Sequence, residues 1–435
     1  MAGRSTLAKG LTALAVVLAV IGSVTAWILS YQGYLPGDAV VRSWAAPKDR
    51  AGDGRPNGTW IAGDVAVRSR YDAVTGFGIG EGQDGRKLWE FVPPGRTRIC
   101  GSARHADASV LLVAYGQEGG ATRGKGCAAV LALDTKDGRE LWTASRTAAD
   151  GGPEQEEPFL DAGSGLAVIG HHSRAGGDRT SLRALDLRTG KPRWTAAMPQ
   201  GCGPRTFSVG GEQVVAVLGC GAGEPGDDGF GETGELTAAA FDLGSGALKW
   251  NVPLDARRPV DLAAAADIVS ADPPVLSVGR SGVSDEGVAF FSFGGDGKPR
   301  PVIESEGVGT SVPARAAVAG DRLYALEGFW QKGQRHRLVA FDLTTGEKVW
   351  RTTLDDPAAA LSLRGDRITV LGEWTTQSTD ITDLLAFDTA DGEEVDFRSF
   401  RDEVPHDIGA VYQHHGRIIV AGSGGGSTFT AYERW

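Results

Sequence analysis

The stretch Leu338-Val-Ala-Phe-Asp-Leu-Thr-Thr-Gly-Glu-Lys-Val-Trp350 is the clearest copy of a unit that recurs along the chain. An apolar strand ends at Phe341, and Asp342 can hydrogen-bond to the backbone two residues further on. Gly346 supplies the positive φ that closes a short turn. Alternation along the second strand places Trp350 on a buried face. The unit therefore predicts two antiparallel strands with the pattern apolar-Asp-x-x-x-Gly-x-x-x-Trp.

Other copies of the unit keep the same internal spacing. Three are as complete as the first, and they contain Asp134, Gly138 and Trp142; Asp186, Gly190 and Trp194; and Asp242, Gly246 and Trp250. Three more are degenerate: Trp89 follows Gly85, but Pro301 follows Gly297 and Asp396 follows Gly392 where tryptophan is expected. We expect looser contacts around Pro301 and Asp396. Copies that recur about 50 residues apart indicate a propeller or a solenoid.

A second periodic signal lies between these copies. It consists of an apolar strand, a tight turn and another apolar strand, as around Gly63-Asp64 and His415-Gly416. Eight such hairpins occur, one more than the copies of the first unit. Thr428 to Glu433 reads as a third strand, and Val40 to Trp44 reads as an isolated fourth strand. We therefore predict an all-β, eight-bladed β-propeller of four-stranded antiparallel blades, closed by its N- and C-terminal strands, which removes exposed edges.

The recurring tryptophans have a structural role in this prediction. A large aromatic side chain that packs between blades removes about 200 Å² from water. We assign this blade-docking role to Trp44, Trp89, Trp142, Trp194, Trp250 and Trp350.

The N-terminus contains a long apolar run. No charged residue occurs from Leu11 to Leu29, whereas Arg4 and Lys9 precede the run. This asymmetry predicts a cytoplasmic tail (1–10), a transmembrane signal-anchor (11–30), a linker (31–39) and an extracytoplasmic propeller (40–435), in a single-pass protein of the cell membrane. Val24-Thr25-Ala26 leaves a cleaved signal peptide as the alternative.

Four cysteines follow the apolar run, and an even number in an oxidising compartment predicts two disulfides. Cys202 and Cys220 lie symmetrically about Gly210-Gly211, so they should face each other across a hairpin. Cys100 and Cys127 then form the second pair by subtraction. We expect both disulfides to be structural.

The unit at Ala132 to Trp142 and Ala184 to Trp194 resembles the repeat of the pyrroloquinoline-quinone-type β-propellers, the quinoprotein alcohol dehydrogenase-like fold. The resemblance covers residues 40–435 and implies the propeller scaffold. It also implies two functional branches: quinone-dependent dehydrogenases that bind calcium, and non-enzymatic members such as the propeller lipoprotein of the outer-membrane β-barrel assembly machine. The chain has no adjacent cysteine pair and only two asparagines, Asn57 and Asn251, so the family's catalytic and calcium ligands do not carry over.

The net charge and the paired histidines argue against two classes of binding site. The formal net charge is −11 without a basic block, which argues against nucleic-acid binding. The pairs His171-His172 and His414-His415 are not expected to bind a metal, because adjacent side chains on a strand point to opposite faces. The sequence thus predicts neither catalytic, cofactor-binding nor metal-binding residues.

Aromatic residues occur in the loops between the second and third strands of three blades: Phe230, Phe329, Trp330 and Trp374. They either cover the core of their own blades or form a partner surface. We predict a binding or interaction scaffold for a protein or cell-envelope ligand, tethered to the membrane by its N-terminal helix. The alternatives are a quinone-dependent oxidoreductase that uses pyrroloquinoline quinone with calcium in the channel, and an extracytoplasmic sensor.

Overall fold

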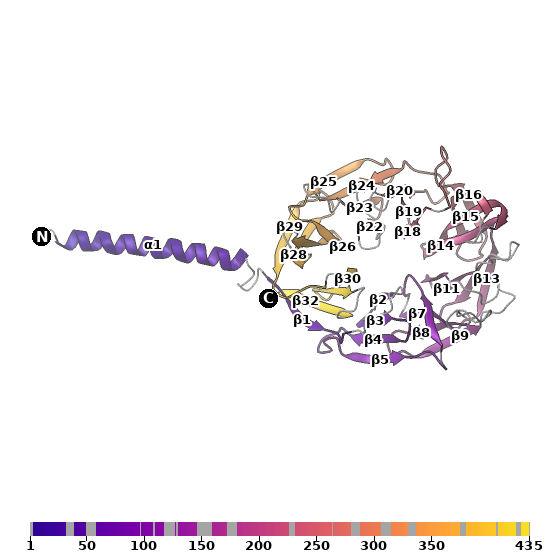
Figure 1. The fold of residues 1–435 in the computed structure, drawn as a ribbon, viewed down its shortest axis with the longest axis horizontal. Coiled ribbons are helices and arrows are strands. Elements are labelled where there is room, and N and C mark those ends of the chain that lie inside the picture. The colour runs from indigo at the N-terminus through magenta and orange to yellow at the C-terminus, as the bar shows by residue number, and fades with distance from the viewer. Residues whose placement is uncertain are drawn as a thin grey trace.

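The computed structural model contains one helix, α1 (Gly3–Tyr31), and a ring of β-sheets (Figure 1). The structure describes residues 3–31, 39–48, 58–95, 97–107, 109–116, 127, 129–145, 159–171, 181–225, 231–262, 264–279, 288–305, 315–328, 336–374, 380–405, 408–422 and 428–434. Every regular element after α1 in these ranges is a strand, so the prediction of an all-β fold is confirmed.

The sheets are arranged like the blades of a propeller, with one edge of each four-stranded sheet and both edges of the eight-stranded sheet toward the centre of the ring (Figure 1). The innermost strands are β2 (Thr59–Ala62), β6 (Arg98–Ser102), β10 (Phe159–Gly163), β14 (Cys202–Gly210), β18 (Ala266–Ala271), β22 (Ala316–Ala319), β26 (Ala358–Arg364) and β30 (Ile408–His414). The second strands are β3 (Val65–Ser69), β7 (Val110–Gly116), β11 (Leu166–His171), β15 (Gln213–Pro225), β19 (Pro274–Gly279), β23 (Arg322–Glu327), β27 (Arg367–Trp374) and β31 (Arg417–Gly422).

The outer half of each sheet is built in the same way. The third strands are β4 (Val74–Gly78), β8 (Ala129–Asp134), β12 (Ser181–Asp186), β16 (Gly231–Asp242), β20 (Val288–Ser292), β24 (Arg337–Asp342), β28 (Asp380–Asp388) and β32 (Phe429–Arg434). The outermost strands are β5 (Lys87–Phe91), β9 (Glu140–Ser145), β13 (Pro192–Ala197), β17 (Leu248–Pro253), β21 (Ile303–Ser305), β25 (Lys348–Thr353), β29 (Glu394–Phe400) and β1 (Ala39–Ala45).

The strands pair in six four-stranded sheets and one eight-stranded sheet, whose order is β26-β27-β28-β29-β1-β32-β31-β30. Within the eight-stranded sheet, β1 pairs antiparallel with β32, and Arg42 is the register partner of Tyr432. At its other edge β1 pairs parallel with β29 through Ala39 and Val40. Strand β1 therefore lies between β29 and β32, in the middle of the eight-stranded sheet.

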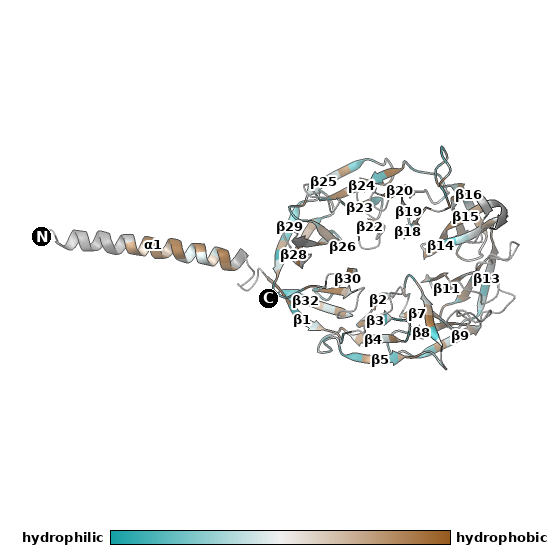
Figure 2. Ribbon diagram, viewed as in Figure 1, coloured by the Kyte–Doolittle hydropathy of each residue, from teal (hydrophilic) through white to brown (hydrophobic). Residues whose placement is uncertain are grey.

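Burial follows position within the sheet. Val110 to Ala114 of β7 and Val130 to Leu133 of β8 are completely buried, because both faces of the middle strands pack against neighbouring sheets. The outermost strands alternate instead, and the buried residue of β5 is Trp89. Figure 2 shows the corresponding mixture of hydrophilic and hydrophobic residues along β5 and β25. The core is thus divided among the junctions between sheets.

The recurring unit folds as a strand, a capped turn and a bulged strand. The Asp342 carboxylate accepts hydrogen bonds from the amides of Thr344 and Thr345, both at 2.8 Å, and these bonds lower the pKa of Asp342. Gly346 has φ +74°, as the turn requires. Ala340 pairs with Trp350 and Phe341 with Lys348, so that a β-bulge lies at Val349. The same shift in register precedes Trp89, Trp142, Trp194 and Trp250.

The N-terminal helix requires a correction. Within the part of the chain that the structure describes, no helix is long and apolar enough to cross a membrane. The prediction of a transmembrane signal-anchor in a single-pass cell-membrane protein is therefore not supported.

Candidate functional site: the central cavity and the two faces of the ring

Tryptophans join most of the neighbouring sheets. The Trp89 indole donates a hydrogen bond to the Thr135 carbonyl of the next sheet at 2.9 Å, and a Cβ atom on Gly138 would lie 2.5 Å from the Trp89 ring. Equivalent indole-to-carbonyl bonds run from Trp142 to Leu187, Trp194 to Leu243, Trp250 to Gly295 and Trp350 to Thr389. The glycine of each following turn therefore provides both the turn conformation and the space for the indole.

Trp44 extends this arrangement to the first sheet. Its side chain is 6% exposed, and a Cβ atom on Gly85 would lie 2.4 Å from its ring. Where Pro301 replaces tryptophan, its Cβ atom lies 2.8 Å from a Cβ atom built on Gly346, so the close approach is retained. Asp396 instead accepts hydrogen bonds from Arg398 at 3.0 Å and from Arg434 at 2.7 Å.

Both predicted disulfides are present. Cys202 of β14 is bonded to Cys220 of β15, its register partner, with a Cα–Cα distance of 4.0 Å. Cys100 of β6 is bonded to Cys127, with a Cα–Cα distance of 6.1 Å. No free cysteine remains, because these are the four cysteines of the chain.

A cavity of about 740 Å³ lies between the innermost strands. Its lining comes from β2, β6, β10, β14, β18, β22 and β30 and from the residues that follow β3 and β6. The ionisable residues of the described lining are Arg70, Tyr71, Arg104, His105, Asp267 and Tyr412.

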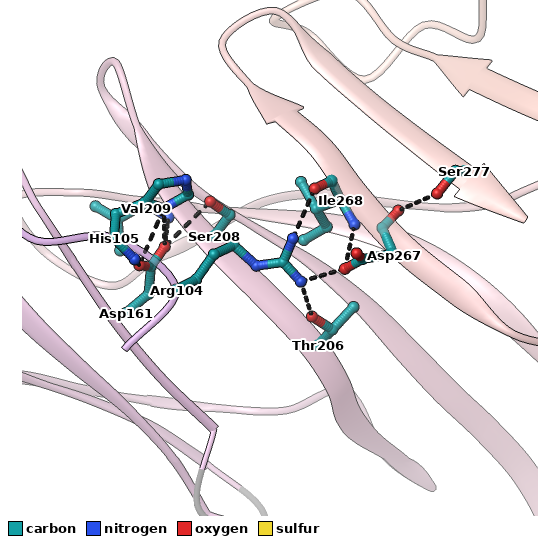
Figure 3. A network of polar contacts seen from close by, with 9 residues as sticks. All are labelled: Arg104, His105, Asp161, Thr206, Ser208, Val209, Asp267, Ile268 and Ser277. Atoms are coloured by element: carbon teal, nitrogen blue, oxygen red, sulfur yellow. Dashed lines mark hydrogen bonds and ion pairs between the residues drawn. The ribbon is translucent and has the colours of Figure 1, made fainter. Parts of the chain in front are cut away.

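Arg104 connects distant parts of this lining. From the connection between β6 and β7, its guanidinium donates hydrogen bonds to the Ile268 carbonyl at 2.8 Å and to the Thr206 hydroxyl at 3.3 Å. It also forms an ion pair with Asp267 (Figure 3). The two side chains are 28% and 32% exposed. Arg104 thus ties the second sheet to the fourth and fifth.

The neighbouring His105 belongs to a second polar network. Asp161, which is completely buried, accepts hydrogen bonds from the amides of His105 at 2.9 Å and Val209 at 2.8 Å (Figure 3). The His105 ring lies 3.1 Å from Asp161 Oδ1, and the Ser208 hydroxyl donates to Oδ2 at 3.1 Å. Because the partners come from the sheets on either side of the one that holds Asp161, this carboxylate braces the inner ring.

The cavity does not match a calcium–quinone site. Calcium takes six to eight oxygen ligands, many of them carboxylate or amide oxygens. In the described lining, Asp267 is the one carboxylate, and its charge is already paired with Arg104. The chemistry of the donors therefore does not fit pyrroloquinoline quinone with calcium, and we derive no reaction through this group.

The predicted partner residues lie largely beyond the described part of the chain. Phe230, Phe329 and Trp330 are outside the described residues. Trp374 ends β27, where its backbone pairs with Asp380 at the start of β28. Nothing in the structure tests whether the aromatic side chains meet.

The opposite face contains a cluster that the sequence analysis missed. Asp64, in the turn between β2 and β3, has Oδ1 3.0 Å from Nε2 of both His414 and His415. These contacts lower the pKa of Asp64. We expected His415 in a turn but applied the alternation of a strand to the pair, and His415 does lie in the turn, with φ +46°. The alternation rule does not apply to a turn residue, and the two rings lie on the same side.

The family model described as "Outer membrane protein assembly factor BamB" matches residues 41–204, 79–295, 234–395 and 334–433. A comparison with curated protein sequences finds no match.

Similar folds occur among solved structures. The quinohemoprotein alcohol dehydrogenase ADHIIG of Pseudomonas putida HK5 has a TM-score of 0.53 and 13% identity, over 92% of this chain and 77% of that one. Sqt1 of Saccharomyces cerevisiae has a TM-score of 0.53 and 9% identity, over 92% and 99%. BamB from Moraxella catarrhalis has a TM-score of 0.47 and 14% identity, over 86% and 96%. At these identities the first two similarities show the fold alone.

Proposed function

We propose that this chain, which belongs to the PQQ-like propeller family of the outer membrane protein assembly factor BamB, is a non-catalytic scaffold that binds a protein or cell-envelope ligand on one face of its ring. The observation that carries the proposal is the difference between the two faces. The ligand would bind on the face where the longer connections between strands lie.

Most connections on one face are short turns, although residues 103–109 join β6 to β7 and residues 293–302 join β20 to β21. Gly63 and Asp64 alone join β2 to β3, and Ser164 and Gly165 alone join β10 to β11. The turns between third and fourth strands lie on this same face, and each is closed by backbone hydrogen bonds such as Gly346 N to Asp342 O at 2.8 Å. Few side chains here are left to vary for recognition.

The other face has room for recognition. Four of the eight connections between second and third strands are longer and span residues 117–128, 172–180, 280–287 and 328–336, whereas the other four span residues 70–73, 226–230, 375–379 and 423–428. Recognition residues are typically placed on such loops, which a rigid scaffold positions. In the sequence, Phe230, Phe329 and Trp330 lie between a second and a third strand and Trp374 is the last residue of β27, which supports the use of this face for binding.

The interior supports a binding role rather than catalysis. The charged side chains of Arg104 and Asp161 form contacts between sheets, as described above. A quinone-dependent oxidoreductase would need carboxylates in the channel that are free to bind a cation. The resemblance to quinohemoprotein dehydrogenases extends to the fold and carries no reaction to this chain.

We also propose that the ring has eight blades. In the order of the eight-stranded sheet, the innermost strands β26 and β30 lie at the two ends and the outermost strands β29 and β1 lie in the middle. This order is that of two four-stranded blades joined at their outer edges. The proposal counts β30, β31, β32 and β1 as the last blade, closed by the pairing of β1 with β32.

The binding face can be tested by substitution. The triple variant Phe329→Ser, Trp330→Ser and Trp374→Ser removes the aromatics, whereas Val349→Ser with Phe397→Ser removes apolar side chains that are 42% and 45% exposed on outermost strands. Crosslinking capture from the native source, followed by identification of the captured chains, should give one specific partner with the wild type and the control pair. The triple variant should lose that partner.

The outcomes are decisive when all three proteins keep the same circular dichroism and unfolding midpoint. Undiminished capture by the triple variant would overturn the proposed face. The oxidoreductase alternative has its own test, in which purified protein is mixed with pyrroloquinoline quinone and calcium. Stoichiometric binding with dye reduction would overturn the non-catalytic proposal.

A further inference from the structure

Two hairpin turns from opposite ends of the chain meet on the face of tight turns. Asp64 lies between β2 and β3, whereas His414 and His415 lie at the turn between β30 and β31, and their contacts span sequence separations of 350 and 351 residues. Oδ1 of Asp64 is 3.0 Å from Nε2 of each histidine. Two imidazoles and one carboxylate therefore converge at the junction between the first sheet and the strands that end the chain.

The turn explains how neighbouring histidines converge. His415 and Gly416 have φ +46° and +77°, and the flanking residues His414 and Arg417 are register partners. Positive φ at both central residues is typical of a type I′ hairpin turn. The turn brings the two rings to a centroid distance of 4.2 Å at an interplanar angle of 64°. Both Nε2 atoms can thus point to one place.

The carboxylate is held from the other side. The carbonyl of Asp64 accepts a hydrogen bond from the Ile79 amide at 2.9 Å, and Gly63 takes φ +57° in the same turn. A Cβ atom on Gly80 would lie 3.2 Å from the Asp64 side chain, so Gly80 leaves room for it. The backbone therefore fixes the position from which Asp64 reaches the histidines.

We propose that Asp64, His414 and His415 form a binding site for a divalent transition-metal ion of the Zn²⁺ class, which clamps the first and last hairpins of the ring together. Ligand atoms about 2.0 to 2.1 Å from a tetrahedral zinc ion lie about 3.3 Å from one another. The 3.0 Å separations from Oδ1 to both Nε2 atoms are close to that spacing. Small movements of the side chains would admit the ion.

The donor set selects the class of metal. Imidazole nitrogens suit zinc, copper, nickel and iron, whereas calcium and magnesium prefer oxygen ligands. The side chains of Asp64, His414 and His415 are 58%, 16% and 69% exposed, so the ion would be reached from solvent and water could complete its coordination. A metal that binds the folded ring and not the unfolded chain adds its binding free energy to stability.

The test uses the purified full chain after treatment with a chelator. Zinc is titrated in competition with a chromophoric chelator, and the thermal unfolding midpoint is measured with and without a slight molar excess of zinc. The key variant is His415→Asn, because Asn-Gly is the preferred sequence of a type I′ turn. It removes one ligand while favouring the fold. Asp64→Ala removes the carboxylate, and Asp366→Ala is its matched control in the turn between β26 and β27.

The wild type and Asp366→Ala should bind one zinc ion per chain and unfold at a higher temperature when zinc is present. His415→Asn and Asp64→Ala should each bind zinc at least tenfold more weakly and lose the zinc-dependent rise, while the metal-free unfolding midpoint of His415→Asn stays at or above that of the wild type. The proposal is overturned if the wild type binds no zinc, or if all four proteins bind it equally, which would show adventitious binding elsewhere.

Discussion

Two kinds of junction occur in the ring, one between neighbouring sheets and one within the eight-stranded sheet. At the junction of Trp89 with Gly138, an indole lies on a glycine turn and donates to the Thr135 carbonyl. Where β29 meets β1, two backbones pair directly and Asp396 binds Arg434. The difference has a physical cause: a tryptophan needs a covalent turn in the next sheet to pack against, and β32 and β1 are not joined by one. At this junction an aspartate that pairs with Arg434 is therefore better suited than a tryptophan, which would have no turn to pack against.

The first prediction removes an indole. Trp89→Ala should lower the free energy of unfolding by about 3 to 5 kcal/mol, since it deletes a large buried side chain and leaves a cavity. Urea denaturation followed by far-ultraviolet circular dichroism measures the effect. A loss below about 1 kcal/mol would mean that the junctions are held by something other than their tryptophans.

The second prediction separates packing from turn conformation. Gly138 and Gly165 have φ +72° and +77°, but a Cβ atom would meet the Trp89 ring at Gly138 and nothing within 4 Å at Gly165. Gly138→Ala should therefore cost about 1 to 3 kcal/mol more than Gly165→Ala, the typical cost of overpacking. Equal unfolding midpoints of the two variants would contradict the close indole contact.

The third prediction concerns the junction of β29 with β1. Arg434 is 63% exposed where it binds Asp396, and Asp396 retains Arg398 as a second partner. Arg434→Ala should therefore cost no more than about 1 kcal/mol, as surface ion pairs do. The difference from the wild type should shrink further in high salt. A loss as large as that of Trp89→Ala would remove the distinction between the two kinds of junction.

The smallest expected effect lies beside the same junction. Burial raises the pKa of Asp383 on β28, although Thr382 and Ser399 donate hydrogen bonds that oppose the rise. A carboxyl with a raised pKa in the folded chain favours folding least once pH has risen above that pKa. Asp383→Asn should therefore raise the thermal midpoint at pH 7 and lose this advantage near pH 4. A lower midpoint at pH 7 would show that the hydrogen bonds outweigh burial.

Much of the ring could be predicted because the residues that form each unit lie close together in the sequence. The Asp342 cap, the Gly346 turn and the spacing to Trp350 lie within one short stretch, and the structure forms each of them. The pairing of Cys202 with Cys220 followed from symmetry about a turn. The bulge at Val349 was not predictable, because alternation alone already placed Trp350 on the buried side.

The polar contacts within the ring could be predicted less well from the sequence. Arg104 meets Asp267 across the cavity, and no spacing in the sequence indicates which sheets will face each other. The turn at His415-Gly416 was predicted, but the side chains of His414 and His415 were assigned to opposite faces by a strand rule that does not hold for a turn residue. Asp64 lies far from both histidines in sequence, so their meeting depends on the geometry of the whole ring.

During synthesis of the chain, β1 is made long before β32, the strand with which it pairs. Arg42 leaves the ribosome about 390 residues before its partner Tyr432, and translation at about 5 to 20 residues per second makes this interval roughly 20 to 80 s. Throughout that interval β1 has no partner strand and β29, once made, has an open edge. A nascent chain of this protein therefore has to be kept from pairing with other chains until β32 has been made.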